Sequence, residues 1–551
     1  MASMLQMLPP LLSLQGIALV VLANVLLLFV IQKTVYKIPY PKNIPLLGEP
    51  EGARRFSMKT AFRYYTDCPG LFRDAYDNYV KKGKPVVLPG LGFRHEVIMP
   101  TSLMRWVQAQ PEDVLNPLEA FAEVDQVHHA LGHSRYVTDP WQGFLVKTEL
   151  NLVLENICAA MNDELGVAFD RWFGTSPEWR EIDLFKCIRM VVAQAASRFT
   201  IGPPMCRDEE YMNLSYDLID ALVLNAGAVG GAPRILRPLV GFLLNVPMAR
   251  RIKRLSEMFA PVWAERVEIL KRAREDPDTP EPQDHLQMMA RWAEKNRPEE
   301  FASLDMMTKR LLAANFGSMH QTSIQATNML LNILGSDAEF NTLSVLRDEV
   351  SRVHSEDGSG GDGWTKAKVS RMVKADSVAR ETLRLQSFGG RALFRKVMVD
   401  GYRTPEGHDL PKGTLISFLG QPAQTDGERF EDPLKYDPFR FSRARENAAA
   451  RDEKAPPVTF VSTGPEYLPF GHGKHACPGR FLIDFELKMI IAYVLGHYDV
   501  EFPADCRESF PAPYEPESSG RISETVPEWG IGATPCPRIV PEPVAETSLW
   551  P

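Results

Sequence analysis

The spacing of hydrophobic positions predicts a mainly helical chain that begins with a long apolar segment. Residues 1–32 contain no Lys, Arg, Asp or Glu, and residues 11–31 are mostly apolar. Between residues 111 and 297, apolar side chains recur at helical spacing. Strand-like segments cluster at only two places, residues 86–99 and 393–417. The pattern therefore indicates a mainly α fold with small β-sheets.

The apolar segment at residues 11–31 predicts a single transmembrane helix. About 20 residues of helix cross the hydrocarbon core of a bilayer, and Lys33, Lys37 and Lys42 follow the segment. Positive charge on this side predicts that the rest of the chain faces the cytosol. A cleaved signal peptide is the alternative, but it requires a basic segment followed by a shorter apolar run. We therefore expect a membrane anchor at residues 1–37.

A proline-rich segment, residues 38–50, follows the anchor. Pro39, Pro41 and Pro45 block helix formation and favour extended backbone. This segment is therefore expected to act as a stiff hinge or an ordinary linker. The body of the chain begins at residue 51. Its composition is ordinary for a globular protein, because the whole chain is 44% hydrophobic and 24% charged.

Charge and cysteine content exclude several classes of protein. The 62 Lys and Arg residues against 70 Asp and Glu residues give a net charge of −8, whereas a dedicated nucleic-acid-binding protein is usually basic. No nucleic-acid partner is therefore expected. The seven cysteines are scattered and form no C-x-x-C pair. This distribution argues against a disulfide framework or a four-cysteine zinc site, and it favours a reducing compartment.

Two other segments have some features of ligand sites. His128, His129 and His133 could place two imidazoles on one helix face, but no carboxylate lies at the spacing of a zinc protease. Residues 358–363 are glycine-rich but lack the Lys-Ser/Thr pair that follows a phosphate-binding loop. We interpret the histidines as ordinary core or surface residues and the glycines as a flexible loop.

Residues 302–334 form the longest predicted helix in the middle of the chain. Few of its positions are polar, so burial is expected, and Gly335 stands where a C-terminal cap would lie. Its centre, residues 315–323, nevertheless carries six polar side chains, which are costly to bury unless they are paired or line a wet cavity. The segment is therefore either a polar part of the core or a helix crossing an active site, with a groove opened at Gly317.

One cysteine has neighbours suited to metal ligation. Cys477 lies in a glycine-rich loop just before an apolar helix predicted at residues 482–494. The N-terminus of that helix and the nearby His475 favour a thiolate. Gly473 and Gly479 permit tight turns and the close approach of a flat group. A cysteine thiolate is one of the few protein ligands that hold haem iron.

Two further segments contain charged residues that can pair. Glu381 and Arg384 are three positions apart, so both lie on one face of a helix. Arg440 follows in the segment 436–441 and could complete a buried network of three charges, which is tolerable only when the charges are paired. Alone, the first pair carries little information, because such pairs are common on solvated helices.

Together, in this order and spacing, these segments resemble the cytochrome P450 family of haem-thiolate monooxygenases. The family's loop has the form F-x-x-G-x-x-x-C-x-G, and Phe470, Gly473, Cys477 and Gly479 fill its fixed positions. The E-x-x-R and P-x-R-F segments match as well. The resemblance covers the whole chain and is strongest to fungal microsomal members. It implies a cytochrome P450 haem domain at residues 51–551 in the endoplasmic reticulum membrane, facing the cytosol.

The resemblance also implies roles on the cysteine side of the haem. Cys477 would be the iron ligand of haem b, and Phe470 would shield its sulfur. Glu381, Arg384 and Arg440 would form a structural triad without a chemical role.

The resemblance further implies partners for the two haem propionates. His475 would bind one of them, and Arg395 the other, with Arg391 as the alternative. Lys147 is a weaker candidate for the same task.

The helix opposite the cysteine departs from the family pattern A/G-G-x-D/E-T-T/S. His320 stands at the acidic position, Gln321 at the threonine position, and Thr322 follows. These three are the candidate catalytic residues. A glutamine can donate and accept hydrogen bonds, but it cannot relay a proton as a hydroxyl does. Oxygen activation is therefore expected to use His320, Thr322, a water chain or a substrate hydroxyl.

The implied activity is monooxygenation of a lipophilic small molecule with O₂ and electrons from NADPH. NADPH-cytochrome P450 reductase would deliver the electrons, and Lys474, Arg480, Arg443 and Arg445 would give its docking face a positive charge. Secondary-metabolite intermediates such as terpenoids, polyketides or alkaloids are the implied substrates. Two alternatives remain: a haem-thiolate enzyme that rearranges or dehydrates its substrate without external electrons, and a non-catalytic haem sensor.

Overall fold

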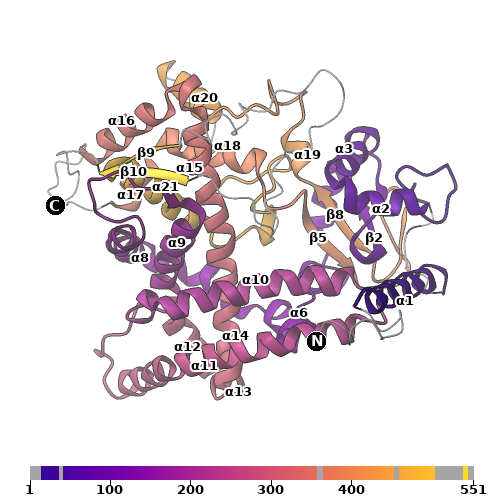
Figure 1. Cartoon of the computed structure of the whole chain (residues 1–551), viewed down its shortest axis with the longest axis horizontal. Coiled ribbons are helices and arrows are strands. Elements are labelled where there is room, and N and C mark those ends of the chain that lie inside the picture. Colours follow the sequence, from indigo (N-terminus) through magenta and orange to yellow (C-terminus); the bar gives the residue numbers. More distant parts are fainter. Residues whose placement is uncertain are drawn as a thin grey trace, which may run out of the picture. The chain divides into compact units, whose positions relative to one another are not determined.

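The chain folds into two compact units, each built from several stretches of sequence (Figure 1). The computed structural model describes residues 14–35, 41, 43–355, 364–451, 458–502 and 538–543. The first unit comprises residues 1–139, 220–250 and 393–419. The second comprises residues 140–219, 251–392 and 420–551.

A five-stranded sheet forms the centre of the first unit. Its strands, in spatial order, are β1 (Val86–Pro89), β2 (His95–Ile98), β8 (Leu415–Leu419), β5 (Arg391–Val397) and β3 (Leu115–Asn116). β1 and β2 are antiparallel, whereas β2 and β8 are parallel. Every residue of β1 and β8 is buried, because both strands are largely apolar. The two strand-rich segments predicted from the sequence are confirmed.

The second half of the proline-rich segment packs along this sheet. The backbone N–H of Leu47 donates to the carbonyl of Val87 at 3.0 Å, and the N–H of Val87 donates to the carbonyl of Pro45 at 2.9 Å. Leu46 and Leu47 are buried. The prolines predict extended backbone, but the described residues of this segment form turns around a single bridge between Leu46 and Val87. Burial of Leu46 and Leu47 attaches the segment to the unit. Residues 38–40 and 42 lie outside the described part of the chain.

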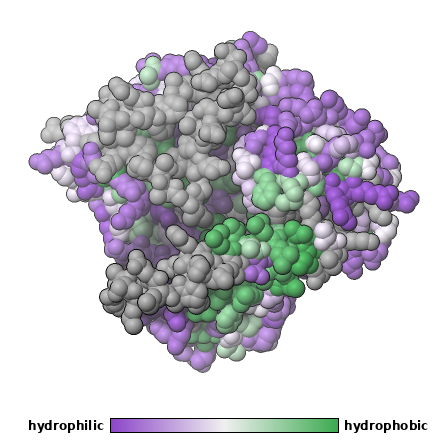
Figure 2. Space-filling view, turned by 45° about the vertical axis from the view of Figure 1, so that its right-hand side comes forward, coloured by the Kyte–Doolittle hydropathy of each residue, from purple (hydrophilic) through white to green (hydrophobic). Residues whose placement is uncertain are grey.

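The N-terminal helix α1 (Leu14–Val35) carries exposed apolar side chains, among them Leu19, Leu22 and Leu27. In the described part of the chain, no helix combines the length and the apolar character that crossing a membrane requires. The predicted span begins at residues 11–13, which lie outside that part. Figure 2 shows that hydrophobic residues gather on one area of the surface. Exposed apolar residues at the start of α11 (Arg237–Glu275) include Leu239, Phe242 and Leu243.

The second unit is mostly helical. Its principal helices are α8 (Trp141–Trp172), α9 (Leu184–Thr200), α16 (Thr342–Ser355), α18 (Val373–Leu385) and α21 (Arg480–His497). A three-stranded sheet has the order β4 (Ile182–Asp183), β10 (Arg538–Pro543) and β9 (Tyr498–Glu501). The expected mainly α fold with small β-sheets is therefore confirmed.

The predicted helix at residues 302–334 is divided into three parts, α14 (Leu304–Asn315), a π turn η7 (Phe316–His320) and α15 (Gln321–Phe340). The expected cap at Gly335 is wrong, because α15 continues to Phe340. The residue that caps its C-terminus is Asn341, whose φ is 50°. Asparagine tolerates this left-handed conformation, so the helix can end there without glycine.

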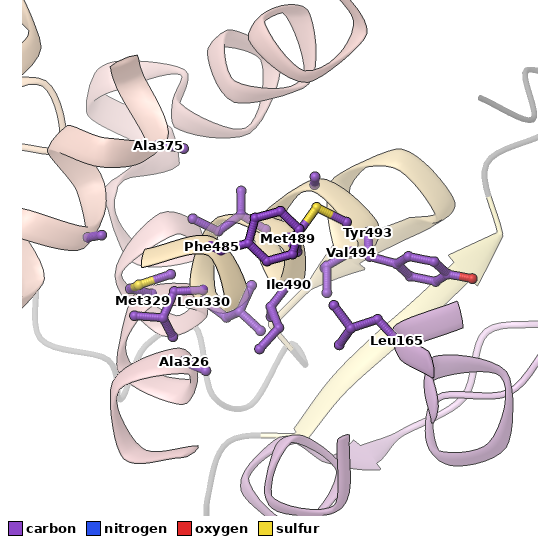
Figure 3. Packing of buried hydrophobic residues seen from close by; sticks show 14 of the residues in the cluster. Leu165, Ala326, Met329, Leu330, Ala375, Phe485, Met489, Ile490, Tyr493 and Val494 are labelled. Carbon is purple, nitrogen blue, oxygen red and sulfur yellow. The ribbon is translucent and has the colours of Figure 1, made fainter. Parts of the chain in front are cut away.

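The core of the second unit is built from α8, α9, α15, α16, α18 and α21. Figure 3 shows Ala326, Met329 and Leu330 of α15 beside Phe485 and Ile490 of α21. All of them belong to one cluster of buried hydrophobic residues. The cysteine loop precedes α21, and Cys477 packs against the same cluster. Packing in this core therefore fixes both α15 and the base of the cysteine loop.

Candidate active site

The loop around Cys477 is built from two tight turns followed by the start of α21. Gly471 and Gly473 have φ angles of 66° and 72°, a left-handed conformation that favours glycine. Gly473 opens a short 3₁₀ turn, η8 (Gly473–His475). The backbone N–H of Cys477 donates to the carbonyl of Phe470 at 2.8 Å, which closes the loop. Cys477 thus stands three residues ahead of Arg480, where α21 begins.

Hydrogen-bond donors surround the sulfur of Cys477. The backbone N–H groups of Gly479 and Arg480 and the charge of Arg480 all act to lower the pKa of its thiol, but burial acts more strongly and raises that pKa overall. The start of α21 and the charge of Arg480 therefore favour the thiolate, as expected, but burial of the thiol outweighs them. A metal ion at the sulfur would change the balance, because metal coordination deprotonates a thiol.

Several glycines of the second unit border open space, and two of them belong to segments of the candidate site. A Cβ atom added to Gly479, beside Cys477, would meet no heavy atom within 4 Å, and the same holds for Gly317 in the π turn. Phe470 is buried and packs edge-on against Phe460, with ring centroids 5.1 Å apart. A thiol with backbone donors nearby and unfilled space beside it fits a flat metal-bearing group such as haem.

Glu381, Arg384 and Arg440 come together as the predicted buried network. Glu381 and Arg384, both on α18, are completely buried, and their nearest charged atoms are 2.7 Å apart. Arg440, at the start of α20 (Arg440–Ala450), reaches Glu381 at 3.0 Å through its Nε. The remaining donors of both arginines reach backbone carbonyls, including that of Lys435. The network joins α18 to the segment before α20 and does not touch the cysteine loop through any of these bonds.

The predicted propionate ligands occupy different surroundings. Arg395 lies on β5 in the first unit and is buried, and burial lowers the pKa of its guanidinium to about 10. Arg391 begins the same strand and is half-buried. His475 ends η8, also half-buried. Lys147 of α8 donates to the carbonyl of Lys474 at 3.4 Å, so it approaches the backbone of the cysteine loop.

Two side-chain hydroxyls donate hydrogen bonds to backbone carbonyls in or next to the π turn η7. Oγ of Ser318 donates to the carbonyl of Ala314 at 3.1 Å, and Oγ1 of Thr322 donates to the carbonyl of Ser318 at 2.7 Å. His320 stacks on Phe316, with ring centroids 6.1 Å apart. These contacts commit the hydroxyl proton of Thr322 to its own helix. Oε1 of Gln321 is buried and has no hydrogen-bond partner among the described residues.

The basic residues expected on the docking face are partly neutralised. Arg443 forms two hydrogen bonds to Asp437, and Arg445 reaches Asp376 at 3.3 Å. Nη1 of Arg480 donates to the carbonyl of Cys477 at 2.7 Å. Lys474, the fourth of these residues, is exposed. Two of the four expected positive charges, those of Arg443 and Arg445, are therefore paired with carboxylates.

The remaining sequence candidates do not form a metal site. His128 and His129 lie in α6 (Val127–Leu131), and Nδ1 of His133 accepts a hydrogen bond from the backbone of Arg135. Within the described ranges, no group of three His, Cys, Asp or Glu side chains could hold a metal ion. The glycine-rich residues 358–363 lie outside those ranges.

Sequence reasoning missed a second buried charge network, on the helix that follows the cysteine loop. Nζ of Lys488, on α21, lies 2.8 Å from Asp376 and 2.7 Å from Asp484. Lys488 and Asp376 are both buried. The available signal was the presence of three charged residues, Asp484, Glu486 and Lys488, in a helix otherwise predicted to be apolar. The network ties α21 to α18 and so supports the loop that ends at Arg480.

Comparison with known proteins relates this geometry to one family. The family profile named Cytochrome P450 matches residues 142–516. The cytochrome P450 monooxygenase pbrC of Penicillium brasilianum is 51% identical over 488 residues, which cover 88% of this chain and 90% of that protein. The cytochrome P450 monooxygenase astC of Aspergillus terreus is 49% identical over 489 residues, with the same coverage. The cytochrome P450 monooxygenase tenB of Beauveria bassiana is 46% identical over 480 residues, which cover 85% and 87% of the two chains.

Among solved structures, the retinoic acid-bound cyanobacterial CYP120A1 aligns with a TM-score of 0.60. The alignment covers 92% of this chain and all of the other, at 16% identity. At that level of identity, the likeness concerns the fold alone.

Proposed function

This chain belongs to the cytochrome P450 family, and on that premise we propose that Cys477 is the axial thiolate ligand of its haem iron. Members of the family are haem-thiolate monooxygenases that receive electrons from a redox partner. The haem, when bound, supplies oxygen activation and the oxidation of a bound substrate. The protein contributes binding, orientation and control of protons.

The single observation that carries the assignment of Cys477 is its place in the loop. The thiol lies just before α21, with the backbone N–H groups of Gly479 and Arg480 near its sulfur and open space beside Gly479. Gly473 permits the turn that directs the loop, and Phe470 closes it from the core. These groups would hold the ligand in one orientation and keep water from the sulfur.

On the distal side, we assign the control of protons to His320, Gln321 and Thr322. The hydroxyl of Thr322 is bonded to the carbonyl of Ser318, so it can accept a hydrogen bond but has its proton engaged. The amide of Gln321 can orient a water molecule, while a proton must arrive from another group, because an amide does not ionise near neutral pH. The imidazole of His320 is the nearby side chain that can bind and release protons.

His475 and Arg395 are the proposed partners of the haem propionates, with Arg391 as the alternative. Arg395 is buried and uses Nη1 to reach the carbonyl of Phe394 at 2.8 Å. A buried guanidinium is stabilised by an anionic partner, which supports Arg395 over the half-buried Arg391. Replacing each arginine with leucine and measuring the fraction of enzyme that retains haem tests the choice. Greater haem loss with the Arg391 variant would reverse the assignment.

The proposed substrate is a lipophilic small molecule, a secondary-metabolite intermediate such as a terpenoid, polyketide or alkaloid. Support comes from the fungal relatives at 46% to 51% identity, all of which are named monooxygenases. The experiment is incubation of the enzyme with reductase, O₂ and candidate intermediates, with and without NADPH. Product formed only with NADPH is expected. Product formed equally without it would favour rearrangement or dehydration, the alternative suggested by glutamine at the family's threonine position.

We further propose that residues 1–37 anchor the chain in the endoplasmic reticulum membrane through a span at residues 11–31, followed by the hinge at 38–50 and the haem domain at 51–551. The apolar sequence of the first segment and the exposed leucines of α1 support the anchor. The exposed apolar side chains at the start of α11 support a further lipid contact. NADPH-cytochrome P450 reductase, held in the same membrane, is the proposed redox partner.

Fractionation of cells that express the full chain or residues 38–551 tests the anchor. The full chain is expected in the membrane fraction even after a high-salt wash, and the shortened chain is expected to be released at least in part. Complete release of the full chain by salt would contradict a transmembrane anchor.

A further inference from the structure

A buried polar cluster joins two helices directly before the distal π turn. Asn315, the last residue of α14, is fully buried. Its Nδ2 donates to the phenol oxygen of Tyr211 at 2.8 Å and lies 3.3 Å from Oγ of Ser215. Tyr211 and Ser215 occupy successive turns of α10 (Glu209–Gly231) and are also fully buried. The helix α10 therefore holds the side chain that immediately precedes η7.

A third wall of the cluster comes from α9. The hydroxyls of Ser197 and Thr200 are buried and lie within hydrogen-bonding reach of the phenol of Tyr211, but neither has a further hydrogen-bond partner among the described residues. Oδ1 of Asn315 is also without such a partner. Leaving a buried polar atom unpaired costs about 1–3 kcal/mol, and a water molecule with two to four polar partners commonly removes that cost. The cluster has the polar groups of an internal water site.

The backbone of the π turn continues from this cluster. Oγ of Ser318 lies 3.1 Å from the carbonyl of Ala314 and 3.4 Å from that of Asn315. The carbonyl of Ser318 in turn accepts the hydroxyl of Thr322 at 2.7 Å. A sequence of side-chain-to-carbonyl bonds thus runs from the anchored Asn315 to the residue beside Gln321. Because the backbone carbonyl of Asn315 is one of these acceptors, holding the Asn315 side chain also fixes the start of the series.

We propose that Tyr211 and Asn315, together with a water molecule held by Ser197 and Thr200, are positioning residues that fix the distal π turn. They act through η7 and do not touch the reacting atoms. By this means the position of α10 sets the orientation of the Gln321 amide. This inference rests on the proposed function, because it takes η7 as the distal side of the haem site.

A matched control lies on the same helix. Tyr216 is buried, and its hydroxyl donates to the carbonyl of Arg189 on α9 at 2.8 Å. Tyr216→Phe therefore removes the same atom and one buried hydrogen bond, but that bond joins α10 to α9 and not to α14. Tyr211→Phe removes only the oxygen that accepts from Asn315.

Hydrogen exchange measured by mass spectrometry on the full-length, haem-loaded enzyme tests the proposal. Tyr211→Phe and Asn315→Leu are each expected to raise amide exchange in residues 316–323 by about 5- to 10-fold, the change that loss of one buried hydrogen bond produces. The double variant is expected to exchange no faster than the faster single variant, because both remove the same contact. Tyr216→Phe is expected to leave this segment unchanged.

Two outcomes would overturn the proposal. One is unchanged exchange in residues 316–323 after Tyr211→Phe. The other is an equal increase after Tyr216→Phe, which would show a general loosening of α10. If Asn315→Leu does not fold, Ser215→Ala replaces it, since it removes the weaker contact of Asn315 and is expected to give a smaller increase.

A second readout uses imidazole as a probe of the distal side. The dissociation constant of imidazole is measured by absorbance titration. It is expected to change about threefold in Tyr211→Phe, a change in free energy at the lower end of the range for one buried hydrogen bond. It is expected to stay constant in Tyr216→Phe. Equal constants in all variants would contradict a positioning role. Failure of wild type to show a thiolate-type reduced CO spectrum would contradict the proposed function, while the exchange comparison would still decide the role of Tyr211.

Discussion

Removal of the Glu381 carboxylate is a perturbation whose cost follows directly from the contacts. The carboxylate accepts from Nε and Nη2 of Arg384 at 2.7 and 2.8 Å, from Nε of Arg440 at 3.0 Å and from the N–H of Asp437 at 3.2 Å. Arg384 is completely buried. Its Nη1 donates only to carbonyls, including that of Gln424 at 2.9 Å. Glu381→Ala therefore leaves the buried guanidinium of Arg384 with only uncharged backbone carbonyls as hydrogen-bond partners.

The expected loss is large because one charge of a buried pair stays in the core. Removing one partner of such a pair costs about 3–5 kcal/mol. Glu381→Gln keeps one acceptor oxygen, so a smaller loss of about 2–3 kcal/mol is expected. The measurement is urea-induced unfolding of the haem-loaded enzyme, followed by far-UV circular dichroism, with the free energy of unfolding compared between variants.

An exposed pair of the same spacing provides the control. Glu268 and Lys271, on α11, are three residues apart, 3.5 Å from each other and both exposed. Glu268→Gln is expected to cost less than about 1 kcal/mol. A loss after Glu381→Ala no larger than that of the control would refute the reasoning. The double variant Glu381→Ala with Arg384→Met is expected to recover part of the loss, because it removes the unpaired charge.

Three further predictions concern other buried or distal side chains. Burial raises the pKa of Glu486 to about 8, so its contribution to the free energy of unfolding is present below pH 4.5 and lost as pH rises through 8. The free energy of unfolding, measured by urea titration at several pH values, should fall by up to about 1.4 kcal/mol per pH unit in wild type because of this group. Glu486→Gln is expected to remove that slope, and an unchanged slope would argue against a buried neutral carboxyl. Burial lowers the pKa of His285 to about 4, so its contribution is present above pH 6.5 and lost as pH falls through 4; His285→Gln is expected to flatten the acid side of a plot of melting temperature against pH. Gln321→Thr is expected to lower the hydrogen peroxide released per NADPH oxidised, because it restores a hydroxyl; an equal or greater yield would contradict a role for Gln321 in proton control.

The cysteine loop and the triad could be predicted because their chemistry depends on short local spacing. Gly473 lies four residues before Cys477, and the helix after the loop follows from an apolar run, so one stretch of sequence contains the whole feature. Glu381 and Arg384 meet because helical geometry brings residues three apart together. Only Arg440 required a contact across a long separation, and its place in the family pattern supplied it.

The distal π turn could not be predicted, because the hydrophobic pattern does not record an extra residue in one helical turn. Ser318 and Thr322 stabilise it through carbonyls whose availability depends on the turn itself. Asn315 is held by Tyr211, 104 positions away in sequence. No local pattern marks such a contact, and the polar residues at 315–323 signalled only that the segment was unusual.

The pKa of the Cys477 thiol shows a second limit of sequence reasoning. Basic residues and a helix N-terminus are visible in the sequence, but the degree of burial is not. Burial proves the larger influence and raises the pKa. The thiolate state is therefore expected to depend on the bound iron, a link that only the folded loop reveals.

Ligation of haem iron by the sulfur of Cys477 is the central claim, and the absorption spectrum of the reduced, CO-bound enzyme tests it most directly. Wild type is expected to show the red-shifted Soret band that gives the family its name, and Cys477→Ala is expected to lose it. Cys187→Ala, which removes a half-buried thiol near the carbonyl of Trp172, is expected to keep it. A red-shifted band in Cys477→Ala, or its absence from haem-loaded wild type, would contradict the account.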